Sequence, residues 1–324
     1  MPLITDTPPD LILQELQVLA TELDNIIPAQ APNNILIGTW NLHSFGSVTR
    51  KWTATQKDSP KRDLRGLLAI GNIISRFDVV AIQEVKGNLR ALRDLLKYLG
   101  DNWSFLMTDV TLGDPGNDER MAFLFHRRRI RASGLACELV VPPEWLNPAT
   151  SPVTLREQFA RTPYAVSFRA GNVTFILVTV HIRYGDTSSE RIGEIQAIAQ
   201  WMADWAKRST RWHHNLILLG DFNIDRQGDD LWKAFHSTGL RIPDDLSGLP
   251  RSIFTKPEQP LEKYYDQIAW FVNKSNVPQI DMEYVSGGNF DFVPYVYGND
   301  DLSLTSKSWR VSDHLPLWVQ FRRK

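Results

Sequence analysis

Polar residues that could bind a cation or transfer a proton stand at the ends of several apolar runs in this sequence. They are Asn41 after IGTW, Glu84 after VVAIQ, His181 after LVTV, Asp221 and Asn223 after LILLG, and Asp313 with His314 before LPLWV. If the runs are strands, their ends meet at one edge of a sheet. Oxygen ligands suit a hard cation, and imidazoles beside it could act as general bases. The pattern predicts a cation site with acid/base groups.

Each of these residues, taken alone, also has an ordinary structural explanation. Asp221 could cap a turn in GDFN, and Asn41 could hydrogen-bond its own backbone. His181 and His314 could be core histidines whose nitrogens are satisfied. The functional hypothesis therefore depends on the whole set, which is much more specific than any member.

The apolar runs predict the elements that position this set. The β-rich runs ILIGTW and FDVVAIQEV alternate with helical patterns near Leu64 to Arg76 and Leu89 to Leu99, which indicates an α/β fold. Further strand-like runs follow at MAFLFH, YAVSFR, VTFILVTVHI, LILLGDF, YDQIAWFV and LPLWVQF. So many strands need two sheets. We expect two packed mixed β-sheets, forming a sandwich, flanked by helices.

The first residues predict an amphipathic helix that precedes this domain. Apolar residues at near-helical spacing are Leu11, Ile12, Leu16, Leu19, Leu23 and Ile27. Packing of this helix on its own domain is favoured over binding to a partner. We expect this helix and a linker over residues 1–34. Because no Ser/Gly-rich tract divides the rest of the sequence, we expect one catalytic domain over residues 35–324.

Composition says little about the substrate but restricts the class of protein. A formal net charge of -1 gives no global attraction to nucleic acid, so polyanion binding would need local basic groups and a bound cation. Cys137 is the only cysteine, which excludes a fold held by intramolecular disulfides. We find no signal-peptide pattern and no membrane-spanning apolar run, and expect a soluble, cytoplasmic protein without stable membrane association.

The motifs TWNLHSFG, IQEV, GDFN and SDHLP, in this order, resemble those of the endonuclease/exonuclease/phosphatase superfamily. The segments NDERMAFLF, RTPYAVSF and YDQI fall where the deoxyribonuclease I branch carries an acid, an arginine and another acid. The resemblance covers roughly residues 35–324. It implies the deoxyribonuclease-I-like α/β sandwich and a phosphodiesterase activity.

By this resemblance, Glu84 is the principal metal ligand, Asn41 supports it, and Asp313 lies close to the same ion. The implied metal is Mg²⁺, with Mn²⁺ as an alternative, because oxygen ligands and waters suit a hard octahedral cation. A zinc site would be expected to use several His or Cys ligands.

The resemblance also assigns phosphate-binding and catalytic groups. Asp221 and Asn223 would orient water or phosphate oxygens, and Arg161 would bind the scissile phosphate. Lys86 stands where the nuclease branch has an arginine, and as a lysine it can still bind phosphates of the substrate. An exposed ion pair is the alternative for Arg161.

Two acid-histidine pairs complete the implied site: His314 with Asp266, and His181 with Glu119. Each acid would fix the tautomer of its imidazole and leave the other ring nitrogen free for proton transfer. The resemblance assigns water activation to His314 and assistance to the phosphate or leaving group to His181, although two similar pairs leave this division open.

Other segments could approach the substrate. Asn117 stands where the deoxyribonuclease branch has an aromatic residue that stacks in the minor groove. Lys86 lacks the planar fork of the arginine found in that branch, so tight duplex binding is not expected. The basic loop over residues 50–65 and the HRRRIR stretch over residues 126–131 could contact a polyanion or simply be solvated. His43 could approach the site, and the aromatic stretch over residues 286–301 could form a wall of the cleft or an ordinary surface loop.

The favoured function is a Mg²⁺-dependent endonuclease that nicks DNA with weak sequence preference through histidine-activated water, with RNA as an alternative substrate. A lipid or small-molecule phosphoesterase, sphingomyelinase-like or inositol-phosphatase-like, is the second hypothesis. A non-catalytic binding protein is the third, and the intact residue set argues against it.

Overall fold

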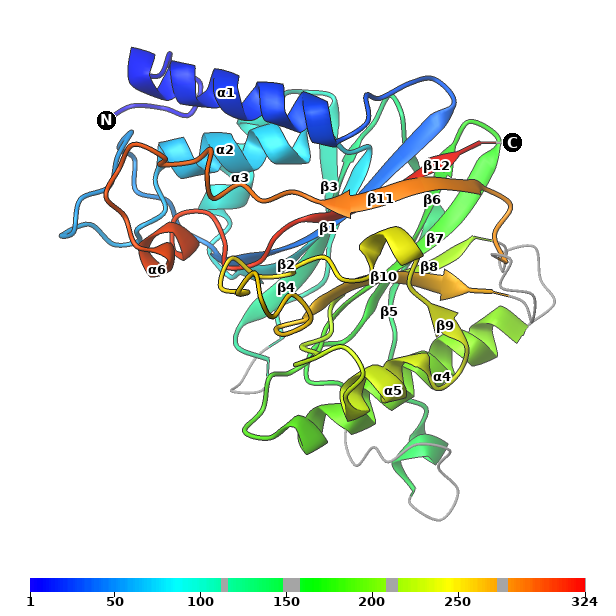
Figure 1. Ribbon diagram of the computed structural model, residues 1–324. Helices are drawn as coiled ribbons and strands as arrows, with labels where there is room; N and C mark the ends of the chain where they lie inside the picture. The colour runs from blue at the N-terminus through cyan, green and yellow to red at the C-terminus, as the bar shows by residue number, and fades with distance from the viewer. Residues whose placement is uncertain (112–115, 148–157, 208–214, 273–278, 324) are drawn as a thin grey trace.

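Two β-sheets packed face to face form the centre of the protein, and helices cover both outer surfaces (Figure 1). The computed structural model describes residues 1–111, 116–147, 158–207, 215–272 and 279–323. The strand order is β11-β12-β1-β2-β4-β3 in the first sheet and β5-β6-β7-β8-β10-β9 in the second. The predicted α/β sandwich of two mixed sheets is confirmed.

The first sheet is assembled around the parallel pair β1 and β2. Its strands are β1 (Asn34–Phe45), β2 (Val79–Lys86), β3 (Trp103–Met107), β4 (Glu119–His126), β11 (Glu283–Asn289) and β12 (Leu317–Arg322). The helices packed beside it are α1 (Asp10–Ile26), α2 (Leu64–Ile74) and α3 (Arg90–Leu99). Helix α2 begins where the Asp63 side chain accepts a hydrogen bond from the Gly66 amide, which satisfies one free backbone donor.

The second sheet is assembled around the parallel pair β7 and β8. Its strands are β5 (Arg131–Glu138), β6 (Tyr164–Ala170), β7 (Val173–His181), β8 (Leu216–Asp221), β9 (Leu240–Arg241) and β10 (Asp266–Phe271). Helices α4 (Ser188–Lys207) and α5 (Asp230–His236) pack on it. Short elements are α6 (Leu304–Ser308) and the 3₁₀ turns η1 (Pro143–Leu146) and η2 (Asp244–Leu246).

Aromatic rings fill the space between the sheets. Phe123 and Phe125 of the first sheet contact Phe168 of the second at ring-centroid distances of 5.5 and 5.4 Å, and Phe175 lies 6.0 Å beyond it. All four side chains are buried. Each buried ring contributes about 1.5–3 kcal/mol relative to exposure, so the core holds the two sheets in a fixed relation. Residues on the edges of both sheets can therefore form one rigid site.

The N-terminal helix packs on the domain, as the favoured alternative predicts. Leu19 and Leu23 are fully buried against the helices of the first sheet, and Glu15 accepts two hydrogen bonds from Arg65 of α2. Among the described residues, no helix is long and apolar enough to cross a membrane.

The aromatic stretch over residues 286–301 is neither a cleft wall nor an ordinary surface loop. Its first residues are the end of β11, and the segment that follows contains Phe290, Phe292 and Tyr297, which are fully buried. The Tyr297 hydroxyl donates to Asp63, and its ring lies under the Arg65 guanidinium. The aromatic residues that suggested a substrate wall belong instead to the core.

Candidate active site

Three strands of the second sheet place three of the predicted catalytic residues in one row. His181 at the end of β7 pairs with Asp221 at the end of β8, and Asp221 pairs with Asp266 at the start of β10. Gly220 allows the backbone to follow this path, because its φ is +132° and a Cβ there would lie 2.2 Å from the Val180 carbonyl oxygen. The sheet register therefore fixes a histidine and two carboxylates in one row at this edge, with Asp221 in the middle.

The first sheet reaches the same edge with Asn41 and Glu84. The pairing of β1 with β2 changes register after Asn41, and Glu84 has a φ of +61°. His43 and Ser44 are also left-handed, with φ values of 43° and 56°. Such backbone is uncommon for residues other than glycine and is typical of functional sites. Here it turns Glu84 toward the cavity described below.

Asn41 links the two sheets at this edge. Its amide nitrogen donates to Glu84 Oε1 and to Asp221 Oδ2, at 3.0 Å in each case. The Ser44 amide donates to the other oxygen of Glu84 at 2.7 Å. Asn41 is completely buried, so these hydrogen bonds hold the two carboxylates at a fixed spacing.

Backbone and side-chain hydrogen bonds fix the segment before β12 that carries Asp313 and His314. The Ser312 hydroxyl donates to the Asn41 carbonyl oxygen at 2.6 Å, and the His314 amide donates to the Ser312 hydroxyl at 3.0 Å. The Trp40 indole donates to the His314 carbonyl oxygen at 2.8 Å. The SDH motif is thus tied to β1.

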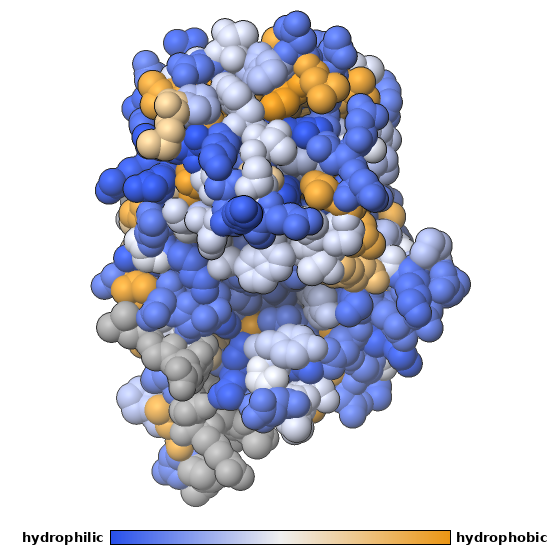
Figure 2. All heavy atoms as spheres, turned by 90° about the vertical axis from the view of Figure 1, so that its left-hand side faces the viewer, coloured by the Kyte–Doolittle hydropathy of each residue, from blue (hydrophilic) through white to orange (hydrophobic). Residues whose placement is uncertain are grey.

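A cavity of about 360 Å³ lies where these residues meet. Figure 2 faces this edge of the sandwich and shows a hollow near the middle of the face, among mostly hydrophilic residues. The lining residues are His43, Glu84, Asn117, Glu119, Arg161, His181, Tyr184, Asp221, Asn223, Tyr265, Asp313 and His314.

His314 and Asp266 form a buried pair beside the cavity. The ring Nδ1 of His314 donates to Asp266 Oδ2 at 2.5 Å. Burial raises the pKa of Asp266 to about 6, although His314 lowers it. Burial alone would lower the pKa of His314, but the charges of Asp266, Asp221 and Asp313 raise it well above its ordinary value. The pair fixes the tautomer of His314 and leaves its Nε2 facing the cavity.

Glu119 joins three basic groups on the other side of the cavity. Its carboxylate lies 2.8 Å from Lys86 Nζ, 2.8 Å from Arg161 Nε and 3.2 Å from His181 Nδ1. Burial alone would raise the pKa of Glu119, but these positive charges lower it to about 2. The His181 contact lacks hydrogen-bond angles, and its Nδ1 has no hydrogen-bond partner among the described residues.

The two histidines face each other across Asp221. Its Oδ2 lies 3.6 Å from His181 Nε2 and 3.9 Å from His314 Nε2. Its Oδ1 accepts a hydrogen bond from the Asn223 amide at 2.8 Å. Two imidazoles, each with an acid at Nδ1 and a free Nε2 aimed at one point, have the arrangement needed for paired acid/base chemistry.

Oxygen groups that suit a hard cation stand beside this point. Glu84 and Asp313 both line the cavity, and Asp313 Oδ1 is buried without a hydrogen-bond partner in the described part of the chain. Across the described residues, no three His, Cys, Asp or Glu side chains form a complete metal cage. This arrangement fits Mg²⁺, which usually takes one or two carboxylates and completes its shell with substrate and water.

The structure brings together the residues that the sequence singled out. Most of them line the cavity, and the three that do not each contact one that does: Asn41 with Glu84, Asp266 with His314, and Lys86 with Glu119. His43 also reaches the cavity. Lys86 is held by Glu119 and by the Asn117 carbonyl oxygen.

The basic loop over residues 50–65 does not offer all of its charges to a polyanion. Arg62 is buried and donates to the carbonyl oxygens of Leu42, His43, Ser44 and Val311. It ties the left-handed turn after Asn41 to the segment before His314 and is a positioning residue. Arg65 is also buried, between Glu15 and Asp300. Neither alternative, contact with a polyanion or a solvated charge, holds for these two buried arginines.

Three aromatic residues at the cavity or beside it do not stand out in the sequence as site residues. Tyr265 lies 5.4 Å from the His314 ring, and Tyr184 is 58% exposed over the Arg191 guanidinium. The Trp309 ring lies 4.3 Å from the His43 ring, and the two planes are tilted by 38°. Tyr265 precedes Asp266 in YDQI, so its place beside the site was a usable signal, whereas Tyr184 and Trp309 stand in segments without a recognisable motif.

A sandwich of two mixed sheets, with paired acid–histidine units and carboxylates at one edge, defines a hydrolase site for phosphate esters. The chain belongs to the Endonuclease/Exonuclease/phosphatase family, whose sequence model matches residues 38–320. Enzymes of this family generally depend on a divalent metal. The resemblance stated from the sequence motifs is confirmed.

Individual proteins similar to this chain differ in what they act on or bind. A deoxyribonuclease of Thioalkalivibrio sp. (strain K90mix) is 26% identical over 309 residues, which cover 91% of this chain and 73% of the relative. A Bacteroides thetaiotaomicron mannosyl-6-phosphatase has a TM-score of 0.54 at 17% identity, with 89% of this chain and 99% of that chain covered. D. rerio TDP2, complexed with a single-strand DNA product, has a TM-score of 0.54 at 13% identity and the same coverage. The two solved structures show a shared fold.

Proposed function

We propose that this protein is a Mg²⁺-dependent phosphodiesterase that nicks DNA with weak sequence preference. The observation that carries the proposal is the convergence of His181 Nε2 and His314 Nε2 on Asp221 Oδ2, at 3.6 and 3.9 Å. A phosphate bound at this point would have one imidazole on the side of the attacking water and the other near the leaving oxygen. General acid/base catalysis of in-line displacement uses a base near the attacking water and an acid near the leaving oxygen.

The chain's own residues supply proton transfer and orientation. Neutral His314 accepts a proton from water at Nε2, because Asp266 holds its Nδ1–H. His181, next to Glu119, donates a proton toward the leaving oxygen. Asp221 and Asn223 orient the water or a phosphate oxygen. The hydrogen bond from the Asn223 amide to Asp221 Oδ1 holds both residues in place. Removal of either imidazole should lower the rate roughly a hundredfold or more.

Glu84, Asn41 and Asp313 are the residues that would hold the cation. When bound, Mg²⁺ would supply positive charge that polarises the phosphate and offsets the surrounding carboxylates. The carboxylates around His314 raise its pKa, so a lower net negative charge favours the neutral imidazole that the mechanism needs. Mn²⁺ is the alternative cation, because it takes the same oxygen ligands.

DNA is the proposed substrate, and RNA is the alternative nucleic acid. The deoxyribonuclease that is 26% identical to this chain supports this choice. Arg161 lines the cavity and can bind phosphate without reading bases, so cutting should depend only weakly on sequence. Lys86 is already paired with Glu119, and Asn117 has no ring to stack in a groove. We therefore expect modest duplex affinity that falls as salt rises.

A substrate panel tests the proposal. Supercoiled plasmid, single-stranded DNA, RNA, sphingomyelin and inositol phosphates are each incubated with the full chain and Mg²⁺, with chelator and the His314→Ala variant as controls. We expect plasmid nicking that both controls abolish. If only lipid or inositol substrates turned over, the protein would be a phosphoesterase of those compounds and the DNA proposal would be wrong.

A further inference from the structure

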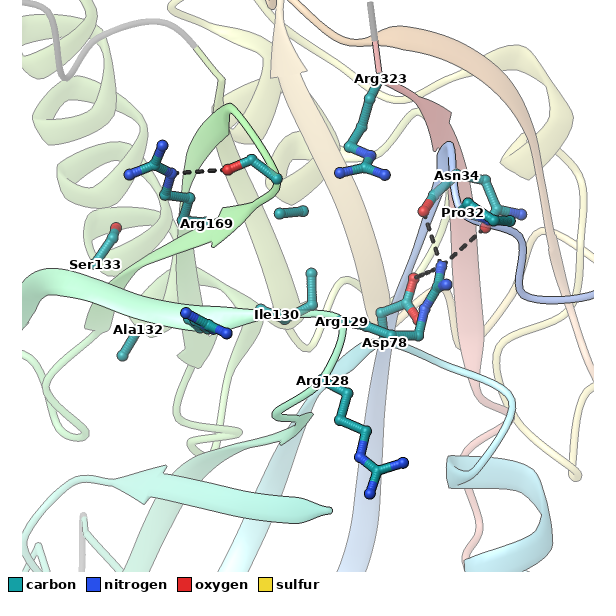
Figure 3. Close-up of a pocket in the computed structure, with 13 residues that line it drawn as sticks. Pro32, Asn34, Asp78, Arg128, Arg129, Ile130, Ala132, Ser133, Arg169 and Arg323 are labelled. Carbon is teal, nitrogen blue, oxygen red and sulfur yellow. Dashed lines mark hydrogen bonds and ion pairs between the residues drawn. The ribbon is translucent and has the colours of Figure 1, made fainter.

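A second cavity, of about 930 Å³, lies at the opposite edge of the sandwich. Asn34 in this cavity and Asn41 at the active site stand seven positions apart on β1, which corresponds to about 20 Å of extended strand. The side chains that give the cavity its charge are those of Arg128, Arg129, Arg131, Arg169, Arg323 and Asp78 (Figure 3). Its charge is therefore strongly positive in a chain with a net charge of -1.

The carboxylate of Asp78 does not neutralise this set. Asp78 is fully buried, forms an ion pair with Arg129 and accepts a hydrogen bond from the Leu36 amide at 2.9 Å. Arg129 also donates to the carbonyl oxygens of Ala31 and Asn34. Asp78 and Arg129 are thus satisfied by each other and by the backbone. The other four arginines have no carboxylate partner in the described part of the chain.

Two of these arginines stand at opposite positions on neighbouring strands. Arg131 of β5 and Arg169 of β6 are directly opposite in the strand register. Like charges in this position destabilise a sheet. Arg169 Nε donates to the Gly171 carbonyl oxygen at 2.8 Å, which fixes its direction. Its terminal nitrogens have no hydrogen-bond partner in the described part of the chain and can bind a ligand. A bound anion would relieve the repulsion.

Arg323 is fixed from the other side. Its amide donates to the Asn33 carbonyl oxygen at 2.9 Å, and its side chain lies between the β6–β7 turn and the Asn34–Arg129 cluster (Figure 3). Gly171 in that turn has a φ of +59°, and a Cβ there would overlap the Arg323 guanidinium. Arg323 Nε is buried and has no hydrogen-bond partner among the described residues. The turn therefore leaves room for the Arg323 guanidinium, whose Nε–H remains available to a ligand.

We propose that this cavity binds a small polyanion built on a chain of two or three phosphate groups, such as inorganic triphosphate or a nucleoside triphosphate. Guanidinium forks bind phosphate oxygens two at a time, and several forks around one cavity suit several linked phosphates. The volume falls in the range of small-ligand sites. Among the described residues that line the cavity, the one carboxylate, Asp78, is paired with Arg129, so the arginines remain available to a ligand.

Calorimetric titration of the metal-free full chain with sodium tripolyphosphate tests the proposal. Arg169→Gln/Arg323→Gln should weaken binding at least about tenfold, because each lost charge-assisted hydrogen bond contributes strongly. Arg93→Gln is the matched control, since Arg93 is an exposed arginine of α3 at another surface, and it should bind like the wild type. An ATP titration distinguishes the two ligands. Tighter binding of ATP than of triphosphate indicates a nucleotide site, and otherwise the site recognises the phosphate chain alone.

Stability separates ligand binding from a structural role. Without ligand, Arg131→Gln should melt at the same or a higher temperature than the wild type, because it removes the repulsion with Arg169, yet it should bind triphosphate more weakly. A purely structural role would lower the melting temperature. The proposal is overturned if the double variant binds normally, if Arg161→Gln abolishes the binding instead, or if only DNA binds.

Discussion

Replacement of Glu119 by glutamine should cost about 3 kcal/mol of stability at neutral pH and little in strong acid. The carboxylate lies within 3.2 Å of Lys86, Arg161 and His181, and its pKa is lowered from 4.5 to about 2. Each pKa unit corresponds to about 1.4 kcal/mol, so a shift of roughly 2.5 units corresponds to about 3 kcal/mol. Glu119 is almost completely buried, so solvent does not screen these contacts strongly.

The sign of the pH dependence follows from the direction of the shift. A carboxyl whose pKa is lower in the folded state stabilises the fold above its unfolded pKa, here 4.5, and loses this contribution as the pH falls toward about 2. Glutamine imitates the protonated acid at every pH. The wild type and Glu119→Gln should therefore differ most at neutral pH and converge in acid.

Urea unfolding of both proteins across this pH range measures the difference. Glu258→Gln is the control, because Glu258 is exposed and removal of its charge should change stability little at any pH. A difference between wild type and Glu119→Gln that stayed constant with pH would refute the electrostatic reasoning and assign the effect to packing. The absence of any difference at neutral pH would refute it as well.

Two further variants test the site. Glu84→Gln should fold normally but lower the rate of phosphodiester hydrolysis by orders of magnitude and weaken Mg²⁺ binding in calorimetry. Wild-type turnover of this variant at saturating metal would show that Glu84 is not the principal ligand. Asp266→Asn should lose roughly 10- to 100-fold in rate, because an amide can hold the wrong tautomer of His314; an unchanged rate would show that this pair does not matter for catalysis.

The sequence predicted the parts of the fold and the site that depend on local pattern. Strand-like runs with polar ends identified both sheets, because buried strands are nearly continuous apolar segments. The same ends located Glu84, Asp221 and His314, which the structure gathers at one cavity. Their motifs are short and continuous, so a single chain is enough to find them.

Features that arise from tertiary packing could not be predicted in the same way. Arg62 looks like one charge among many in a basic loop, yet four carbonyl oxygens from two distant segments surround it. The aromatic residues Phe290 and Phe292 look like a surface cluster, because nothing local shows that they join the same core cluster as residues of α1 and α2. Arg131 and Arg169 meet only through the register of β5 and β6. Such contacts join residues far apart in the chain.

The dependence of plasmid nicking on pH, measured with Mg²⁺ for the wild type, His181→Ala and His314→Ala, tests the central claim most directly. If one histidine takes a proton from water and the other gives one to the leaving oxygen, the wild-type rate should rise and then fall with pH. Each variant should be slower by roughly a hundredfold or more and should lose a different limb of that profile. If both variants kept both limbs, the two imidazoles that face each other across Asp221 would not be the acid and base of the reaction.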